Sequence, residues 1–157
     1  MTATMKFGIG QAITRREDDR LLTGQGRFVD DLGEPGDLHL AFVRSPHAHA
    51  RVSGIDSAEA QAAPGVVAVL TGGQLAADGV GSFALNPALK NAAGQKMSTP
   101  LLTPLAIDVA RFVGQPVAAV VAESRAAAEA AAALLVVDYE PLPAVASLEA
   151  ALANGAP

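Results

Sequence analysis

The sequence predicts an α+β domain with a mixed sheet and short alanine-rich helices, built from two strand-helix-strand units. The first unit falls at residues 51–70, and the second repeats the same order of elements at residues 116–139. The composition supports this prediction, because half of the 157 residues are apolar and 34 are alanine. Since alanine is small, helices and sheet can pack at close range.

The individual elements are predicted from alternation of side chains in strands and from alanine-rich runs in helices. They are strands at residues 38–43, 51–56, 66–70, 116–122 and 134–139, and helices at residues 57–63, 124–133 and 147–152. Asp56 and Glu59 stand at capping-box spacing before the first helix, and Ser124 can cap the second. Arg125 and Glu129, four residues apart, mark the solvated face of that second helix.

The remaining segments are predicted to be irregular. Residues 74–108 contain glycine and proline without a sustained period, which is typical of a long loop. We expect an extended N-terminal arm at residues 1–19, the domain proper at 20–146, and the start of a linker at 147–157. Gly72-Gly73 is expected to end the strand before the long loop.

Charge and composition exclude several classes of function. The formal net charge is −5 and the pI is about 5.0, which argues against nucleic acid as a partner. No apolar run reaches the roughly 18 residues that a membrane span needs. Without cysteine the chain can form no disulfide, thiolate nucleophile or conventional iron-sulfur cluster. The N-terminus lacks the apolar core of a signal peptide, so we expect a cytoplasmic protein.

A histidine pair is the first candidate site. His47 and His49 would project to one side of an extended chain, which is the simplest two-ligand arrangement for a transition metal. A closed site needs further ligands, and nothing in the spacing brings Asp30, Asp31 or Asp56 close. The alternative is that the histidines hydrogen-bond backbone groups at a strand end.

Glycine pairs are the second candidate, because glycine lets backbone amides approach a phosphate. Gly8 and Gly10 form one pair, and Gly24 and Gly26 form the other. Neither completes a nucleotide motif, since Val29 stands where a third glycine would be needed. Turns that require glycine are the alternative.

A serine nucleophile and paired carboxylates are the last candidates. Ser45 lies near His47, but the sequence has no nucleophile elbow, and Pro46 offers no amide for an oxyanion hole. Arg44 is expected instead to make a salt bridge or a backbone contact at a strand end. Paired carboxylates are expected to be solvated or to accept hydrogen bonds in turns, and they are Glu17, Asp18, Asp19, Asp30, Asp31, Asp138 and Glu140.

Five blocks of the sequence occur in a fixed order. One is Arg-Ser-Pro-His-Ala-His-Ala-Arg at residues 44–51, and the others are residues 20–31, residues 55–56 with 64–72, residues 111–122 and residues 137–143. Together these blocks resemble the large subunit of the molybdenum hydroxylases, the family of xanthine dehydrogenase, aldehyde oxidase and carbon monoxide dehydrogenase. One departure is Gln115, where many relatives carry Glu. The resemblance implies the α/β hammerhead domain of that subunit.

The resemblance also implies a longer enzyme that oxidises aldehydes, N-heterocycles or carbon monoxide. Its later domains would bind molybdopterin cytosine dinucleotide, and partner subunits or domains would hold [2Fe-2S] clusters and FAD. None of the family's molybdenum-site motifs matches these 157 residues. We therefore assign no catalytic, cofactor-binding or metal-binding residue, and we expect the isolated chain to be inactive and structural.

The partners implied are the remaining domains of the large subunit and the iron-sulfur and FAD subunits. Surfaces that these would cover should be apolar, so the isolated chain is expected to self-associate. The rival hypothesis is a free-standing protein-interaction module derived from the same domain.

Overall fold

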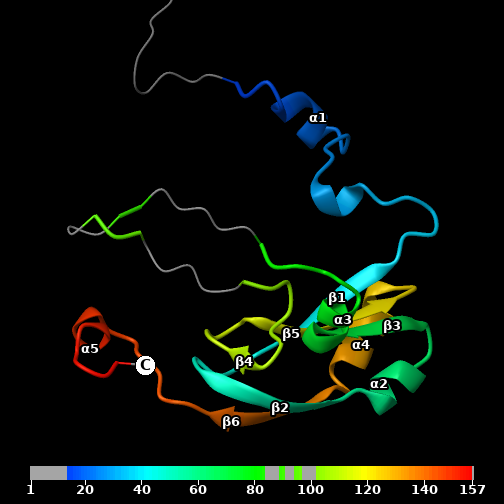
Figure 1. Cartoon of the computed structure of the whole chain (residues 1–157). Helices are drawn as coiled ribbons and strands as arrows, with labels where there is room; N and C mark the ends of the chain where they lie inside the picture. Colours follow the sequence, from blue (N-terminus) through cyan, green and yellow to red (C-terminus); the bar gives the residue numbers. More distant parts are fainter. Residues whose placement is uncertain (1–13, 84–88, 91–93, 97–101, 157) are drawn as a thin grey trace, which may run out of the picture. The chain divides into compact units, whose positions relative to one another are not determined.

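The computed structural model describes residues 14–83, 89–90, 94–96 and 102–156. The chain divides into two compact units, and the boundary lies between Asp37 and Leu38. The second unit contains β1 (His39–Arg44), β2 (Ala50–Asp56), α2 (Ala58–Ala62), β3 (Val66–Thr71), α3 (Gly72–Ala77), β4 (Val109–Ala110), β5 (Pro116–Ala122), α4 (Arg125–Ala132), β6 (Val136–Pro141) and α5 (Leu148–Ala151) (Figure 1). The α+β class is confirmed.

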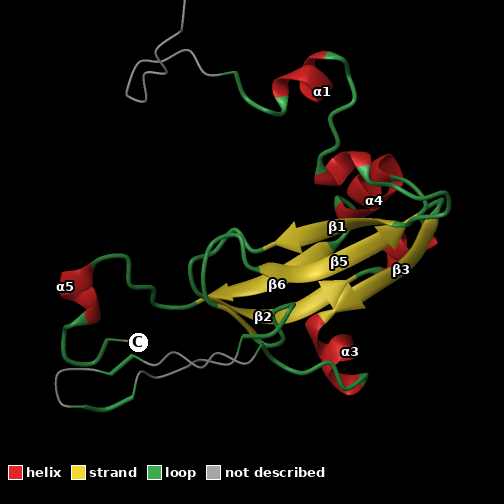
Figure 2. Ribbon diagram, turned by 90° about the horizontal axis from the view of Figure 1, so that it is seen from above, coloured by secondary structure: helices red, strands yellow, loops and turns green. Residues whose placement is uncertain are grey.

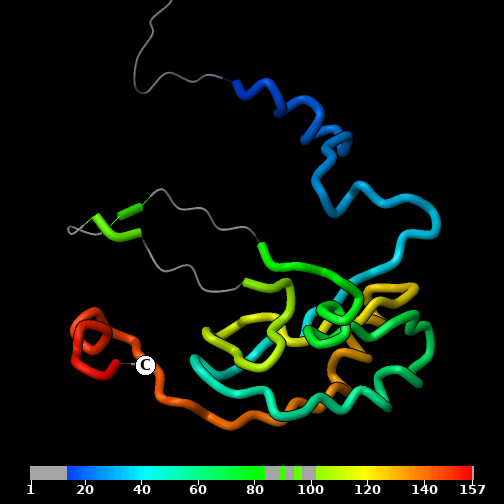
Figure 3. Tube along the Cα trace, viewed as in Figure 1, coloured from blue at the N-terminus to red at the C-terminus, as the bar shows by residue number. Residues whose placement is uncertain are grey.

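The strands form two separate three-stranded sheets, in the orders β1-β5-β3 and β4-β2-β6 (Figure 2). Every pairing between these strands is antiparallel, so the mixed sheet expected from the sequence is wrong. Both predicted strand-helix-strand units exist, but each one crosses between the sheets (Figure 3). Because β2 and β3 enter different sheets, as β5 and β6 also do, neither crossover needs a parallel pair.

Helix α4 forms as the sequence predicts. The Ser124 hydroxyl accepts a hydrogen bond from the Ala127 amide at 3.2 Å, which caps the first turn. Arg125 and Glu129 form an exposed ion pair at 2.9 Å on the solvated face. The next strand begins at Val136 rather than at residue 134, because residues 134 and 135 still donate backbone hydrogen bonds into the end of the helix.

The first hydrophobic cluster lies where α2 and α4 pack on the sheet β1-β5-β3. Its buried members come from both helices, from the strands β3 and β5, and from the turn after α4, and they are Ala60, Val69, Ala118, Val120, Ala131 and Leu135. Half of them are alanine, so the helices approach the sheet closely. We call this group the alanine cluster.

The second hydrophobic cluster lies at the other end of β5. Its buried members are Ala106, Ala110 and Val117, with Val52, Val137 and Tyr139 packed against them. These residues come from both sheets and from the segment before β4. We call this group the joint cluster, because the two sheets meet there.

Two details near the first crossover differ from the sequence prediction. The N-cap of α2 is Ser57, which makes no side-chain cap, and Asp56 Oδ1 instead accepts from the Ala58 amide at 3.0 Å. The predicted capping box with Glu59 is therefore wrong. Gly72-Gly73 ends β3 as expected but also begins the unpredicted helix α3, whose first turn is capped by the Thr71 hydroxyl.

The first unit, up to Asp37, consists of α1 (Asp18–Leu22), a short 3-10 turn (Val29–Asp31) and connecting segments. Neither element contains a buried residue. Gly24, with φ of 71°, ends α1 in a turn in which its amide and that of Gln25 reach back to helix carbonyls. Among the described residues, no helix combines the length and hydropathy that crossing a membrane requires.

Candidate functional site

The buried polar residues among those described, Ser45 and Gln115, lie where the end of β1 meets the turn before β5. The Ser45 amide donates to the Gln115 carbonyl at 2.9 Å, and the Gly114 amide donates to the Ser45 carbonyl at 2.8 Å. The Arg44 guanidinium donates to the Gly114 carbonyl at 2.9 Å. Residues far apart in sequence are therefore locked together through their main chains, and the expected backbone contact of Arg44 is confirmed.

Gln115 is a buried polar side chain at this junction, with 4% of its surface exposed. Its Oε1 atom accepts a hydrogen bond from the Arg111 amide at 2.6 Å. This bond closes the turn 111–115, in which Gly114 takes a φ of 88° that disfavours other residues. The sequence showed Gln115 only as a departure from the family, whereas in the structure its side chain accepts the hydrogen bond that closes this turn.

Ser45 is likewise buried, and its hydroxyl is occupied by the backbone. The Oγ atom accepts from the His47 amide at 3.1 Å and lies 3.2 Å from the His47 carbonyl. This local turn reverses the chain between β1 and β2. The geometry is that of a turn rather than of an activated nucleophile.

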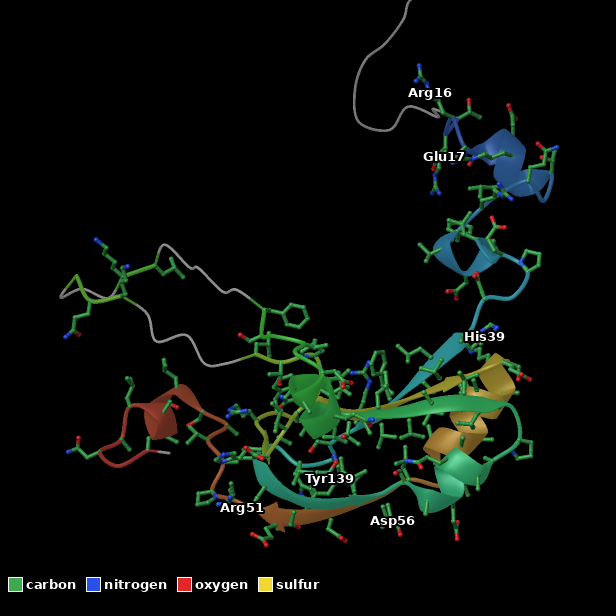
Figure 4. All side chains as sticks on the ribbon, turned by 45° about the vertical axis from the view of Figure 1, so that its right-hand side comes forward. Arg16, Glu17, His39, Arg51, Asp56 and Tyr139 are labelled. Carbon is green, nitrogen blue, oxygen red and sulfur yellow. The ribbon has the colours of Figure 1, made fainter. Side chains whose placement is uncertain are left out.

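Tyr139 is a residue that the sequence analysis missed. It lies on β6 and packs against the joint cluster (Figure 4). The centroid of its ring lies 5.0 Å from that of the His47 ring, and the two planes form an angle of 58°. The buried hydroxyl has no hydrogen-bond partner among the described residues. Burial raises the pKa of this phenol, and the nearby Ser45 hydroxyl, which lowers the pKa, has the smaller effect. The alternation of side chains along residues 137–139 could have indicated that Tyr139 shares a face of the strand with Val137, which packs against the same cluster.

The two histidines do not converge on one point. His47 packs against Tyr139, whereas His49 Nδ1 lies 2.6 Å from the Pro143 carbonyl. The Leu142 amide also donates to the His49 carbonyl at 2.9 Å. The backbone alternative is thus confirmed for His49. Within the described residues, no three side chains of His, Cys, Asp or Glu gather as a metal site would require.

The described residues of the second unit line two cavities considered below. One, of about 360 Å³, is lined by Ala48, His49, Arg111, Pro143, Ala144 and Val145. The other, of about 260 Å³, lies between β2 and the start of α3, and it is lined by Val52, Ser53, Gly54, Ile55, Thr71, Gly72, Gly73 and Ile107. Only the first has charged or ionisable side chains in its wall.

The other candidates from the sequence serve local structure. Asp18 and Asp31 accept backbone hydrogen bonds in turns, and Glu17 and Glu140 pair with arginines at the surface. Gly24 forms the helix-ending turn described above, with no sign of a phosphate cradle. The first glycine pair, Gly8 and Gly10, lies outside the described residues.

These observations define an α+β domain in which the buried side chains of Ser45 and Gln115 make hydrogen bonds to the backbone. A family model for the aldehyde oxidase and xanthine dehydrogenase a/b hammerhead domain matches residues 23–143. The chain belongs to this family.

Three individual proteins illustrate the similarity. The gamma subunit of the 6-hydroxypseudooxynicotine dehydrogenase complex from Paenarthrobacter nicotinovorans is 43% identical over 150 residues, which cover 92% of this chain and 18% of that subunit. Quinoline 2-oxidoreductase from Pseudomonas putida 86 has a TM-score of 0.79 and 48% identity, over 96% of this chain and 18% of that one. The Cu,Mo-CO dehydrogenase has a TM-score of 0.76 and 40% identity, with the same coverage. The chain thus spans less than a fifth of the length of these relatives.

Proposed function

We propose that this chain is the hammerhead portion of a longer molybdenum hydroxylase large subunit, acting in a whole enzyme that oxidises an aldehyde, an N-heterocycle or carbon monoxide. The observation that carries the proposal is the match over 96% of this chain to 18% of the quinoline 2-oxidoreductase chain. Dehydrogenases for a nicotine derivative and for carbon monoxide are similar in the same way. The proposed substrate class is therefore no narrower than the range of substrates named for these relatives.

The role of the chain itself is structural. The buried residues Ser45 and Gln115 make hydrogen bonds that join the end of β1 to the turn between β4 and β5. The residues present do not fit a metal cofactor, because the sequence lacks cysteine and no three-ligand group occurs among the described residues. We place molybdopterin cytosine dinucleotide, the [2Fe-2S] clusters and FAD in domains and subunits outside this chain, and we derive no chemical step here.

The native reading frame distinguishes this role from the rival one, a free-standing interaction module. Sequencing the full transcript should reveal codons that continue beyond Pro157 into the molybdenum-site motifs of the family. A stop codon directly after Pro157, in a gene expressed at that length, would contradict the proposal and favour the module. We propose a cytoplasmic location for either form.

The outer face of β1 supports self-association of the isolated chain. Leu40 and Phe42 in β1 are 52% and 43% exposed, and Leu38, directly before the strand, is 51% exposed, although folded proteins usually bury such side chains. In the whole enzyme we propose that neighbouring domains cover this face. Sedimentation equilibrium should detect dimers or larger species, and Leu40→Lys should shift the population toward monomer. A wild-type chain that stays monomeric at millimolar concentration would contradict self-association.

A further inference from the structure

We infer that the cavity beside His49 and Arg111 binds a small oxyanion, either a carboxylate or a phosphate. This inference does not depend on the role proposed above. The volume of this cavity, about 360 Å³, lies at the lower end of the range for pockets that hold small molecules. The site combines one permanent cation, one imidazole and four small apolar residues.

Arg111 supplies the cation. Its backbone is fixed by the hydrogen bond from its amide to Gln115 Oε1, and its Nη1 atom donates to the Val109 carbonyl at 3.2 Å. A guanidinium has five N–H donors. Among the described residues, the Val109 carbonyl is the one acceptor that the guanidinium contacts, which leaves further N–H donors for an anion.

Two other arginines of the second unit, unlike Arg111, already interact with a carboxylate or an aromatic ring. Arg51 pairs with the Glu140 carboxylate at 3.5 Å, and Arg44 lies over the Phe42 ring while it donates to a carbonyl. Arg111 has no carboxylate partner among the described residues, and neither Asp nor Glu lines the cavity. In a chain of net charge −5 this local positive charge is unbalanced.

His49 supplies the second polar group. Because a carbonyl can only accept, the 2.6 Å contact with the Pro143 carbonyl places a proton on Nδ1 and fixes the ring. Nε2 is then the ring nitrogen left for a ligand. It can accept a hydrogen bond from an oxyanion that carries a proton, such as hydrogen phosphate.

The test is a titration of the 157-residue chain with inorganic phosphate and, separately, with acetate, followed by ¹H–¹⁵N NMR. We expect saturable amide shifts confined to residues 48–49, 111 and 144–145, with a change in the ¹⁵N shift of His49 Nε2. Arg111→Gln should weaken binding about tenfold, because it removes a charge-assisted hydrogen bond. Saturation by only one of the two probes would show whether the cavity binds a phosphate or a carboxylate.

Arg51→Gln is the matched control, since it removes an equal charge near the cavity but outside its wall. It should leave both affinities within a factor of two of the wild type. The fold should survive Arg111→Gln, because Gln115 holds the main-chain amide of residue 111 rather than its side chain. Arg111→Lys, which keeps the charge, should bind more tightly than Arg111→Gln. Non-saturating shifts, or equal losses in Arg51→Gln and Arg111→Gln, would overturn the inference.

Discussion

The alanine cluster and the joint cluster are neighbours on β5 but are stabilised differently. In the alanine cluster, Ala60, Ala118 and Ala131 are fully buried between helices and sheet, and no polar side chain takes part. The joint cluster is bordered by Ser45 and Gln115, whose hydrogen bonds connect segments about 70 residues apart. Close packing thus stabilises the alanine cluster, and hydrogen bonds to the backbone stabilise the joint cluster. Substitutions that add volume or remove an acceptor should separate these two causes.

The largest effect is expected at Gly72, where backbone approaches backbone beside the joint cluster. A Cβ atom there would overlap the Ala106 carbonyl group and lie 3.0 Å from the Leu105 carbonyl oxygen. Gly72→Ala should therefore lower the free energy of unfolding by about 3 kcal/mol. Urea denaturation followed by far-UV circular dichroism measures this change. Gly73→Ala is the control, because no atom lies within 4 Å of its added Cβ. Equal effects of the two substitutions would contradict the close approach.

The next effect tests the alanine cluster directly. Ala131→Leu adds three carbons at a position with 0% exposure and should cost about 2 kcal/mol through overpacking. The adjacent Ala130 is exposed on the same helix, so Ala130→Leu should change stability by less than about 0.5 kcal/mol. A tolerated Ala131→Leu would mean that α4 can move away from the sheet without loss.

At the joint cluster the prediction concerns the loss of a hydrogen-bond acceptor rather than an added side-chain volume. Gln115→Met keeps the length of the side chain but leaves the Arg111 amide without its partner, at a cost of about 1.5 kcal/mol. Gln115→Glu keeps an acceptor oxygen and should cost less than Gln115→Met. Thermal melts of both variants provide the comparison, and the reverse order would show that the hydrogen bond is not what stabilises the turn.

A smaller effect compares two serine caps of the same geometry. Ser124→Ala should destabilise the unit by about 1 kcal/mol, because α4 packs into the alanine cluster. Ser147 caps α5 in the same way, but α5 contains no buried residue. Ser147→Ala should thus leave global unfolding unchanged. A cost from Ser147→Ala as large as that from Ser124→Ala would indicate packing of α5 that contributes to stability.

The smallest effect at neutral pH is expected at Tyr139. Because its buried hydroxyl has no hydrogen-bond partner among the residues that the structure describes, Tyr139→Phe should change stability by less than about 0.5 kcal/mol at pH 7. The folded-state pKa lies above the ordinary value of 10.0, so the unfolded chain ionises first as the pH rises. The wild type should therefore lose stability from about pH 10 upward relative to Tyr139→Phe. Parallel pH profiles of the two proteins would contradict burial of the phenol.

The same contrast explains what could be predicted from the sequence. Alternation and alanine spacing are local signals, and they located five of the strands, the helix after Ser124 and the Arg125–Glu129 pair. Sheet partners are not local, so the crossing of each unit between two sheets was missed, and a mixed sheet was expected instead. The Gln115 tie and the contact between His47 and Tyr139 join distant segments, and no spacing indicates them.

Dye-linked oxidation by the purified 157-residue chain, measured together with its molybdenum content, tests most directly whether the reaction centre lies outside these residues. We expect no bound molybdenum and no turnover of an aldehyde, a purine or carbon monoxide, under conditions in which an intact molybdenum hydroxylase is active. Stoichiometric molybdenum with saturable turnover by this chain alone would contradict the structural role.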